Sequence, residues 1–204
     1  MKYEDVFSAI TSSIDKLDET REKILKIQRK IIRNCSIAIK SVHREDYETY
    51  EEKITEVQTK FDELEELVSV ERGLFFKYLK TPQQEYAEAV CFYSLIKEED
   101  LPTPSELKIN PINYAIGIAD VIGELRRYVL DNIRNSNVDD LNRILEKMDD
   151  LQTHLFSLDY PSGLTFDLRH KTDVARTLIE KTRGDISLSV QMDNLKNQIK
   201  NKLN

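Results

Sequence analysis

A heptad-like apolar pattern runs through the first forty residues and limits what this chain can fold into more than any other feature. Apolar residues recur there every three or four positions from Phe7 to Val42, which is the period of an α-helix whose seam packs against a partner helix. A second apolar line with a seven-residue spacing lies beside that seam, formed by Leu25, Ile32 and Ile39. A face this wide exceeds what one partner helix covers, so we expect several packing partners and self-association.

Turn-forming residues are scarce along the whole chain, which has 204 residues with 5 Gly and 5 Pro. A β-sheet protein of this length would need many more turns. The sequence therefore predicts an all-α fold, one domain over residues 1–204, with about seven helices of which the two N-terminal ones are long.

Local signals place the ends of these helices. We expect the first two helices over residues 3–42 and 45–79. Asparagine or threonine followed by proline is typical of a helix start, which predicts a third helix from Thr81 and a fourth from Asn110 to about Ile133. A fifth helix is expected over 138–156. Gly184 resembles a C-cap, so we expect a sixth helix to end there and a separate seventh to follow.

Features of targeting and redox chemistry favour a cytoplasmic protein. No apolar run approaches the roughly 18 residues of a membrane span, and the first twenty residues lack the apolar core of a signal peptide. The two cysteines, Cys35 and Cys91, are far apart and fit no metal-ligand spacing. We expect them to be small core residues in a reducing compartment, with no membrane partner.

Charge is segregated along the chain although the net charge is −7. The segment 21–44 holds eight basic residues and one acid, and the segment 45–71 holds eleven acids and two lysines. A concentrated basic segment can bind a polyanion such as a nucleic acid. Alternatively, the basic segment pairs with the acidic helix that follows it in an antiparallel hairpin.

Two pairs of carboxylates lie one helical turn apart in otherwise apolar segments. Glu85 and Glu88 are spaced i, i+3, and Asp120 and Glu124 are spaced i, i+4, so each pair shares a helix face. Only Glu124 has a basic residue, Arg127, at the adjacent turn of its own helix. A bridging cation would remove the repulsion, and oxygen ligands favour Mg²⁺ or Mn²⁺. The alternative is that all four acids form an ordinary solvated face.

Three segments carry a resemblance to a known family. They read QEYAEAVCF at residues 84–92, NPINYAIGIADVIGELRR at 110–127 and LRHKTDVARTLIEKTRG at 168–184. The middle one matches the pattern Pro–x–x–Tyr–x–x–Gly–x–Ala–Asp–x–x–Gly–Glu–Leu. Together they resemble the translin superfamily, and within it the TRAX branch in a prokaryotic form, over most of the chain.

The resemblance implies an all-α fold of seven helices, a hollow octamer and binding of single-stranded nucleic acid. For the TRAX branch it also implies Mg²⁺-dependent endoribonuclease activity. Carried over to this sequence, the catalytic and metal-binding acids are Glu85, Glu88, Asp120 and Glu124. The translin branch lacks the aspartate found here at position 120. The loop before the fourth helix is shorter than in TRAX, so partner contacts made by that loop do not transfer.

The sequence thus predicts a Mg²⁺-dependent endoribonuclease that cuts single-stranded RNA inside a closed homo-oligomer, an octamer by resemblance. The residues expected to contact RNA, with single-stranded DNA as an alternative ligand, are Lys26, Arg29 and Arg33 of the first helix and Arg126 or Arg127 near the acids. Two alternatives are a non-catalytic nucleic-acid-binding oligomer and a helical scaffold whose charges serve assembly alone.

Overall fold

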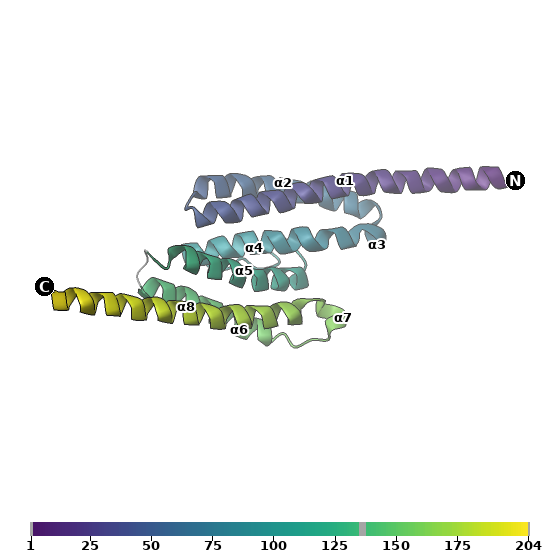
Figure 1. The fold of residues 1–204 in the computed structure, drawn as a ribbon. Coiled ribbons are helices and arrows are strands. Elements are labelled where there is room, and N and C mark those ends of the chain that lie inside the picture. Colours follow the sequence, from purple (N-terminus) through teal and green to yellow (C-terminus); the bar gives the residue numbers. More distant parts are fainter. Residues whose placement is uncertain (1, 135–137, 204) are drawn as a thin grey trace. The chain divides into compact units, whose positions relative to one another are not determined.

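The computed structural model describes residues 2–134 and 138–203, and within those residues every regular element is a helix. The prediction of an all-α fold is confirmed (Figure 1). Six helices have at least four turns, and they are joined by two one-turn α-helices and one 3-10 helix. In chain order the elements are α1 (Tyr3–His43), α2 (Tyr47–Val70), α3 (Arg72–Phe75), η1 (Phe76–Leu79), α4 (Lys80–Lys97), α5 (Pro111–Asn132), α6 (Val138–Phe156), α7 (Ser162–Thr165) and α8 (Leu168–Leu203).

The chain divides into two compact units, Met1–Ala89 and Val90–Asn204, and the boundary falls inside α4. The first unit contains α1, α2, α3, η1 and the first half of α4. The second contains the rest of α4 with α5, α6, α7 and α8. The organisation of the chain as one domain stays a prediction.

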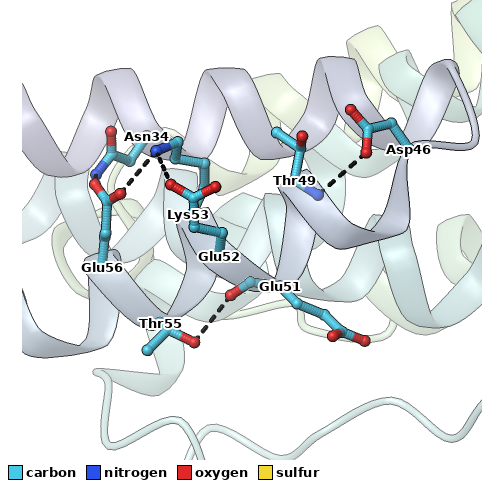
Figure 2. Close-up of polar contacts among 8 residues, drawn as sticks. All are labelled: Asn34, Asp46, Thr49, Glu51, Glu52, Lys53, Thr55 and Glu56. Atoms are coloured by element: carbon cyan, nitrogen blue, oxygen red, sulfur yellow. Dashed lines mark hydrogen bonds and ion pairs between the residues drawn. The ribbon is translucent and has the colours of Figure 1, made fainter.

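The first unit is built on a hairpin of α1 and α2. The C-terminal half of α1 supplies the buried seam that its periodicity predicts, and α2 faces it with a matching row. Asp46 caps α2 by accepting a hydrogen bond at 3.1 Å from the backbone N–H of Thr49 (Figure 2). The fully buried residues of this interface are Ile24, Ile31, Cys35, Ala38, Val42, Val57, Leu64 and Val68.

The N-terminal half of α1 continues past the end of α2 (Figure 1). Its part of the apolar seam is exposed in the single chain, at Tyr3, Val6, Phe7, Ile10 and Ile14. A row of large apolar side chains on a solvent-facing helix is typical of a surface that is covered in an assembly. This exposed row is named the N-terminal apolar row below.

The second unit packs α5, α6 and α8 against one another. The residues of α5 and α8 that contact each other occur in the same order along both helices: Asp120 contacts Lys171, and further along Arg126 contacts Thr182. The two helices therefore run parallel. The buried row of α8 consists of Leu168, Thr172, Ala175, Ile179, Thr182 and Ile186. The row lies on a helix that packs against α5, and the buried apolar residues of α5 include Ile118, Val121, Ile122, Leu125 and Val129.

Several predicted helix ends are confirmed. Asn110 accepts hydrogen bonds from the backbone N–H groups of Ile112 at 2.8 Å and Asn113 at 3.4 Å, and Pro111 is the first residue of α5. The bounds of α6 are the predicted ones, and α1 ends one residue later than expected. The start of α5 is marked by a side chain and a proline that satisfy or replace the orphan N–H groups of its first turn.

The prediction of a second helix to residue 79 is wrong. The chain leaves the helical conformation at Glu71, where φ is −144° and ψ is 71°. One turn of α3 and one of η1 then bury Phe75 and Leu79. The backbone stays helical through Lys80 into α4, so Thr81 lies inside α4 and does not cap it, contrary to prediction.

The prediction that Gly184 ends a helix is also wrong, because α8 continues through it to Leu203. Gly184 has no positive φ, whereas a C-cap glycine adopts the left-handed conformation. The buried row of α8 passes this position without a break, from Ile179 and Thr182 to Ile186. Packing along that row outweighs the cost of a glycine inside a helix, about 1 kcal/mol.

Among the described residues, no helix has both the length and the apolar character that crossing a membrane requires.

Candidate functional site

The first carboxylate pair lies on α4 in the first unit. Glu85 and Glu88 are half-buried and one turn apart. They lie near Cys35, a fully buried residue of α1. Burial raises the pKa of the Cys35 thiol well above its usual range, and the negative charges of Glu85 and Glu88 raise it further. The two carboxylates therefore face the middle of α1, which the sequence did not predict.

Tyr86 fixes this stretch of α4 against α2. Its ring is buried and lies 5.2 Å from the ring of Phe61, and its hydroxyl accepts a hydrogen bond from Gln58 Nε2 at 3.0 Å. A buried tyrosine with its hydroxyl satisfied is a rigid anchor. The anchor lies between Glu85 and Glu88 in sequence, so it fixes the backbone that carries both.

The second pair lies on α5 in the second unit. The side chains of Asp120 and Glu124 are 29% and 23% exposed. Glu124 pairs with Arg127 of the next turn at 3.5 Å, as its spacing predicts. Asp120 also has a cationic partner, because Lys171 of α8 places its Nζ 2.5 Å from Asp120 Oδ1. The compensating charge for Asp120 thus comes from a packed helix and not from its own.

A buried polar contact holds α8 in register with α5. Arg126 donates a hydrogen bond from Nη1 to Thr182 Oγ1 at 3.0 Å, and its Nη2 lies 2.9 Å from Asp185 Oδ2. Thr182 is fully buried and also donates to the carbonyl of Leu178 at 2.8 Å. Since α5 and α8 are parallel, this contact also fixes where Lys171 meets Asp120.

The chemistry of these acids fits Mg²⁺. Magnesium keeps several waters and is usually bound through one or two carboxylates together with substrate phosphates. A half-buried pair with both members on one helix face offers such a donor set, and one oxygen of Asp120 pairs with the Lys171 ammonium, with which a metal would compete. No group of three or more His, Cys, Asp or Glu side chains in the described part of the chain is arranged to hold a metal ion. That all four acids share one metal stays a prediction.

The basic residues of α1 form an exposed line that we name the basic stripe. It consists of Lys26, Arg29, Lys30, Arg33 and Lys40, which share one helix face over about 21 Å. The described residues supply no ion-pair partner to Lys26, Arg29 or Arg33.

The helices α1 and α2 pack as a hairpin, which confirms that part of the alternative prediction. The predicted pairing of the basic-stripe side chains with acids of α2 is wrong, because Figure 2 shows Glu52 and Glu56 of α2 bound to other residues. Lys53 lies 2.7 Å from both Glu52 and Glu56, and Asn34 donates to Glu56 at 2.8 Å. The positive charge of the basic stripe therefore stays on the solvent face.

Comparison with known proteins decides the family. Residues 19–183 match the Translin family. The chain belongs to the translin family. An uncharacterized protein of Methanocaldococcus jannaschii is 38% identical over 185 residues, which is 90% of this chain and 82% of that protein. Mouse translin-associated protein X is 25% identical over 174 residues, which span 60% of the mouse protein.

Solved structures share the fold of this translin-family chain. AfC3PO in a complex with duplex RNA is 25% identical with a TM-score of 0.83, and the match covers 91% of this chain and 97% of that one. A second AfC3PO structure is 28% identical with a TM-score of 0.79 and the same coverage. Apo-NeC3PO, at 24% identity and a TM-score of 0.81, has the same fold.

The two arginines predicted to contact RNA differ in this translin-family structure. Arg126 is largely buried and committed to Thr182 and Asp185, which favours a structural role. Arg127 is half-exposed and lies between Glu124 and Asp131, at 3.5 and 3.7 Å. RNA binding by either residue stays a prediction.

Two residues that lie next to the acids in this translin-family chain could not be predicted from the sequence. Lys171 lies 51 positions from Asp120, and Cys35 lies about 50 positions from Glu85. No spacing rule within a helix connects residues this far apart. Only the parallel pairing of α5 with α8, and the packing of α4 near α1, bring these side chains to the acids.

Proposed function

We propose that this translin-family protein is a Mg²⁺-dependent endoribonuclease that acts on single-stranded RNA inside a closed homo-oligomer. The observation that supports it most directly is the Asp120–Glu124 pair, whose two carboxylates are half-buried and share one face of α5. The four acids of the two pairs, Glu85, Glu88, Asp120 and Glu124, are the residues proposed to bind the metal.

The basic stripe supports the RNA-binding part of the proposal. Its side chains are exposed, and Lys26, Arg29 and Arg33 are unpaired within the described chain, so a phosphate can approach each without displacing an acid. Phosphate contacts of this kind are independent of base sequence and weaken with salt. The similar AfC3PO is known in a complex with duplex RNA. Single-stranded DNA would present the same phosphates.

The N-terminal apolar row supports self-association. Its members Tyr3, Phe7 and Ile14 are more than half exposed in the single chain. Burying this row against a second copy would remove a continuous apolar strip from water. We propose a closed homo-oligomer, an octamer by family resemblance.

Each group of residues has a defined task in the proposed reaction. Bound Mg²⁺ would activate a water and neutralise charge on the phosphoryl group. The carboxylates hold their positions because Tyr86 anchors α4 and the Arg126 contact fixes α5 against α8. One carboxylate accepts the proton of the attacking water. Basic-stripe residues hold the RNA backbone.

The cleavage test uses the purified full chain with labelled single-stranded RNA, first with Mg²⁺ and then with EDTA. We expect cleavage only with Mg²⁺. Glu88→Gln and Asp120→Asn keep the side-chain shape and remove one charge, so each should reduce cleavage to background while the oligomer and RNA binding persist. Glu180→Gln, at an exposed position of α8, removes the same charge away from the acids and should cut normally.

Wild-type cleavage by Glu88→Gln and Asp120→Asn would overturn the proposal, since the activity would then come from another site or a contaminant. A second candidate function is a non-catalytic RNA-binding oligomer. The ion pair of Asp120 with Lys171 favours it, because a carboxylate with a permanent counter-ion needs no metal. Salt-sensitive RNA binding without cleavage at any Mg²⁺ concentration would establish that function.

We place this activity in the cytoplasm. Cys35 and Cys91 are both free and buried, as expected of thiols in a reducing compartment. Fractionation of cells that express the tagged protein tests the location.

A further inference from the structure

The ion pair between Lys171 and Asp120 is built into the second unit. Nζ and Oδ1 are 2.5 Å apart, and the two side chains are 37% and 29% exposed. The neighbouring residues Leu168, Thr172 and Ala175 of α8 are buried, so the backbone that carries Lys171 is fixed. The pair is therefore a positioned contact between two packed helices.

The position of Lys171 on α8 is unfavourable unless an anion accompanies it. The first turn of α8 contains Arg169, His170 and Lys171 and no acid. The N-terminal end of a helix carries partial positive charge and favours acids over bases. Asp167 directly precedes this turn, and Asp120 of α5 supplies the negative charge that contacts the Lys171 side chain itself.

A cation at Asp120 Oδ1 occupies one of the two oxygens that Asp120 could offer to a metal ion. An ammonium and a divalent metal at the same carboxylate repel each other across the site, so each weakens the binding of the other. If Asp120 binds metal, Lys171 therefore opposes it, whether the metal takes Oδ1 or binds Oδ2 beside it.

We propose that Lys171 is a positioning residue that holds the Asp120 carboxylate in the metal-free protein and competes with the metal for it. This inference rests on the proposed function, because it requires Asp120 to be a metal ligand. Lys171 thereby sets the metal affinity of the site, and its removal strengthens metal binding.

The size of the effect follows from the exposure of the pair. Partly exposed ion pairs are modest in strength, and the competition they exert corresponds to about a two- to fivefold change in a dissociation constant. Lys171→Met and Lys171→Gln should bind Mn²⁺ about two- to fivefold more tightly than the wild type. Lys171→Arg keeps the charge and should keep the wild-type affinity.

The experiment titrates Mn²⁺ into the RNA-free protein and follows the unbound ion by electron paramagnetic resonance, so that no catalytic turnover is needed. Lys181→Met is the matched control. Lys181 is an exposed lysine of the same helix, ten residues or about 15 Å further along, and its loss should leave Mn²⁺ affinity nearly unchanged. Thermal unfolding of each variant checks that the fold is retained.

Asp120→Asn separates the failure of this inference from that of the proposed function. If Asp120→Asn weakens Mn²⁺ binding but Lys171→Met and Lys171→Gln leave it unchanged or weaken it, Lys171 is structural and the inference is overturned alone. If Asp120→Asn leaves Mn²⁺ binding unchanged, both the metal site and the inference are overturned. The double change Asp120→Asn with Lys171→Met should bind no more tightly than Asp120→Asn alone, because the carboxylate for which the two cations compete is gone.

Discussion

Neutralising the basic stripe is the perturbation that tests RNA binding most sharply. Lys26, Arg29 and Arg33 lie at i, i+3 and i+7 of α1, are exposed, and have no ion-pair partner among the described residues. Each can therefore neutralise one phosphate. Replacing all three with glutamine keeps helix propensity close to that of lysine and arginine and removes up to three phosphate contacts.

The magnitude follows from counter-ion release. On single strands, the slope of log affinity against log salt is about −0.7 for each phosphate neutralised, so three lost contacts make the slope about 2.1 less steep. Between 50 and 200 mM salt, this corresponds to roughly an 18-fold smaller loss of affinity in the variant than in the wild type.

The assay is fluorescence anisotropy of labelled single-stranded RNA in EDTA, which prevents Mg²⁺-dependent cleavage, over a series of salt concentrations. A control variant replaces Lys108, Arg176 and Lys181, three exposed residues outside α1, and has the same net charge. Equal slopes in the two variants, or affinity that does not depend on salt, would refute the reasoning and leave the basic stripe with a structural role.

Two further predictions concern the packing of α8, and both are measured by urea and thermal unfolding at one fixed protein concentration. Gly184 lies inside α8, and a Cβ added there would have no neighbouring atom within 4 Å. Gly184→Ala should therefore stabilise the protein by about 0.5–1 kcal/mol. A loss of stability would indicate a left-handed C-cap conformation at this residue, which the structure does not have. Arg126→Met removes the contacts to Thr182 and Asp185 and should cost about 1–2 kcal/mol, whereas a cost near zero would show that apolar packing alone sets the α5–α8 register.

The start of α5 was predictable because a side chain marks it locally, whereas the similar signal at Thr81 lies inside a helix. Asn110 and Pro111 satisfy or remove the orphan N–H groups at the start of α5, and such signals can be recognised within a few residues. The end of α2 has no such mark, because Glu71 is neither glycine nor proline. Burial of Phe75 and Leu79 decides that break, and burial depends on residues distant in sequence. The same dependence explains Gly184, whose local signal is overridden by a continuous buried row.

In the candidate site, contacts within one helix were predictable and contacts between helices were not. Pairing within each set of acids was predictable, since i, i+3 and i, i+4 neighbours share a helix face, and the contact of Glu124 with Arg127 is confirmed. The partners from other helices were not predictable. Lys171 reaches Asp120 only because α5 and α8 run parallel, and that pairing follows from their buried faces.

The charge of Asp120 is compensated from a packed helix, and this changes how the acids of α5 should be judged. Asp120 has no basic neighbour at the adjacent turns of its own helix, and Lys171 of α8 supplies one, whereas Glu124 pairs with Arg127 of its own helix. Repulsion between these two carboxylates therefore cannot be what attracts a metal ion. A dication has to outcompete an ammonium already in place, and only its higher charge, further oxygen ligands and the phosphates of bound RNA favour it. If Asp120 is a metal ligand, as proposed, the metal should bind most tightly when RNA is present, and the chemistry would be confined to the RNA-bound protein.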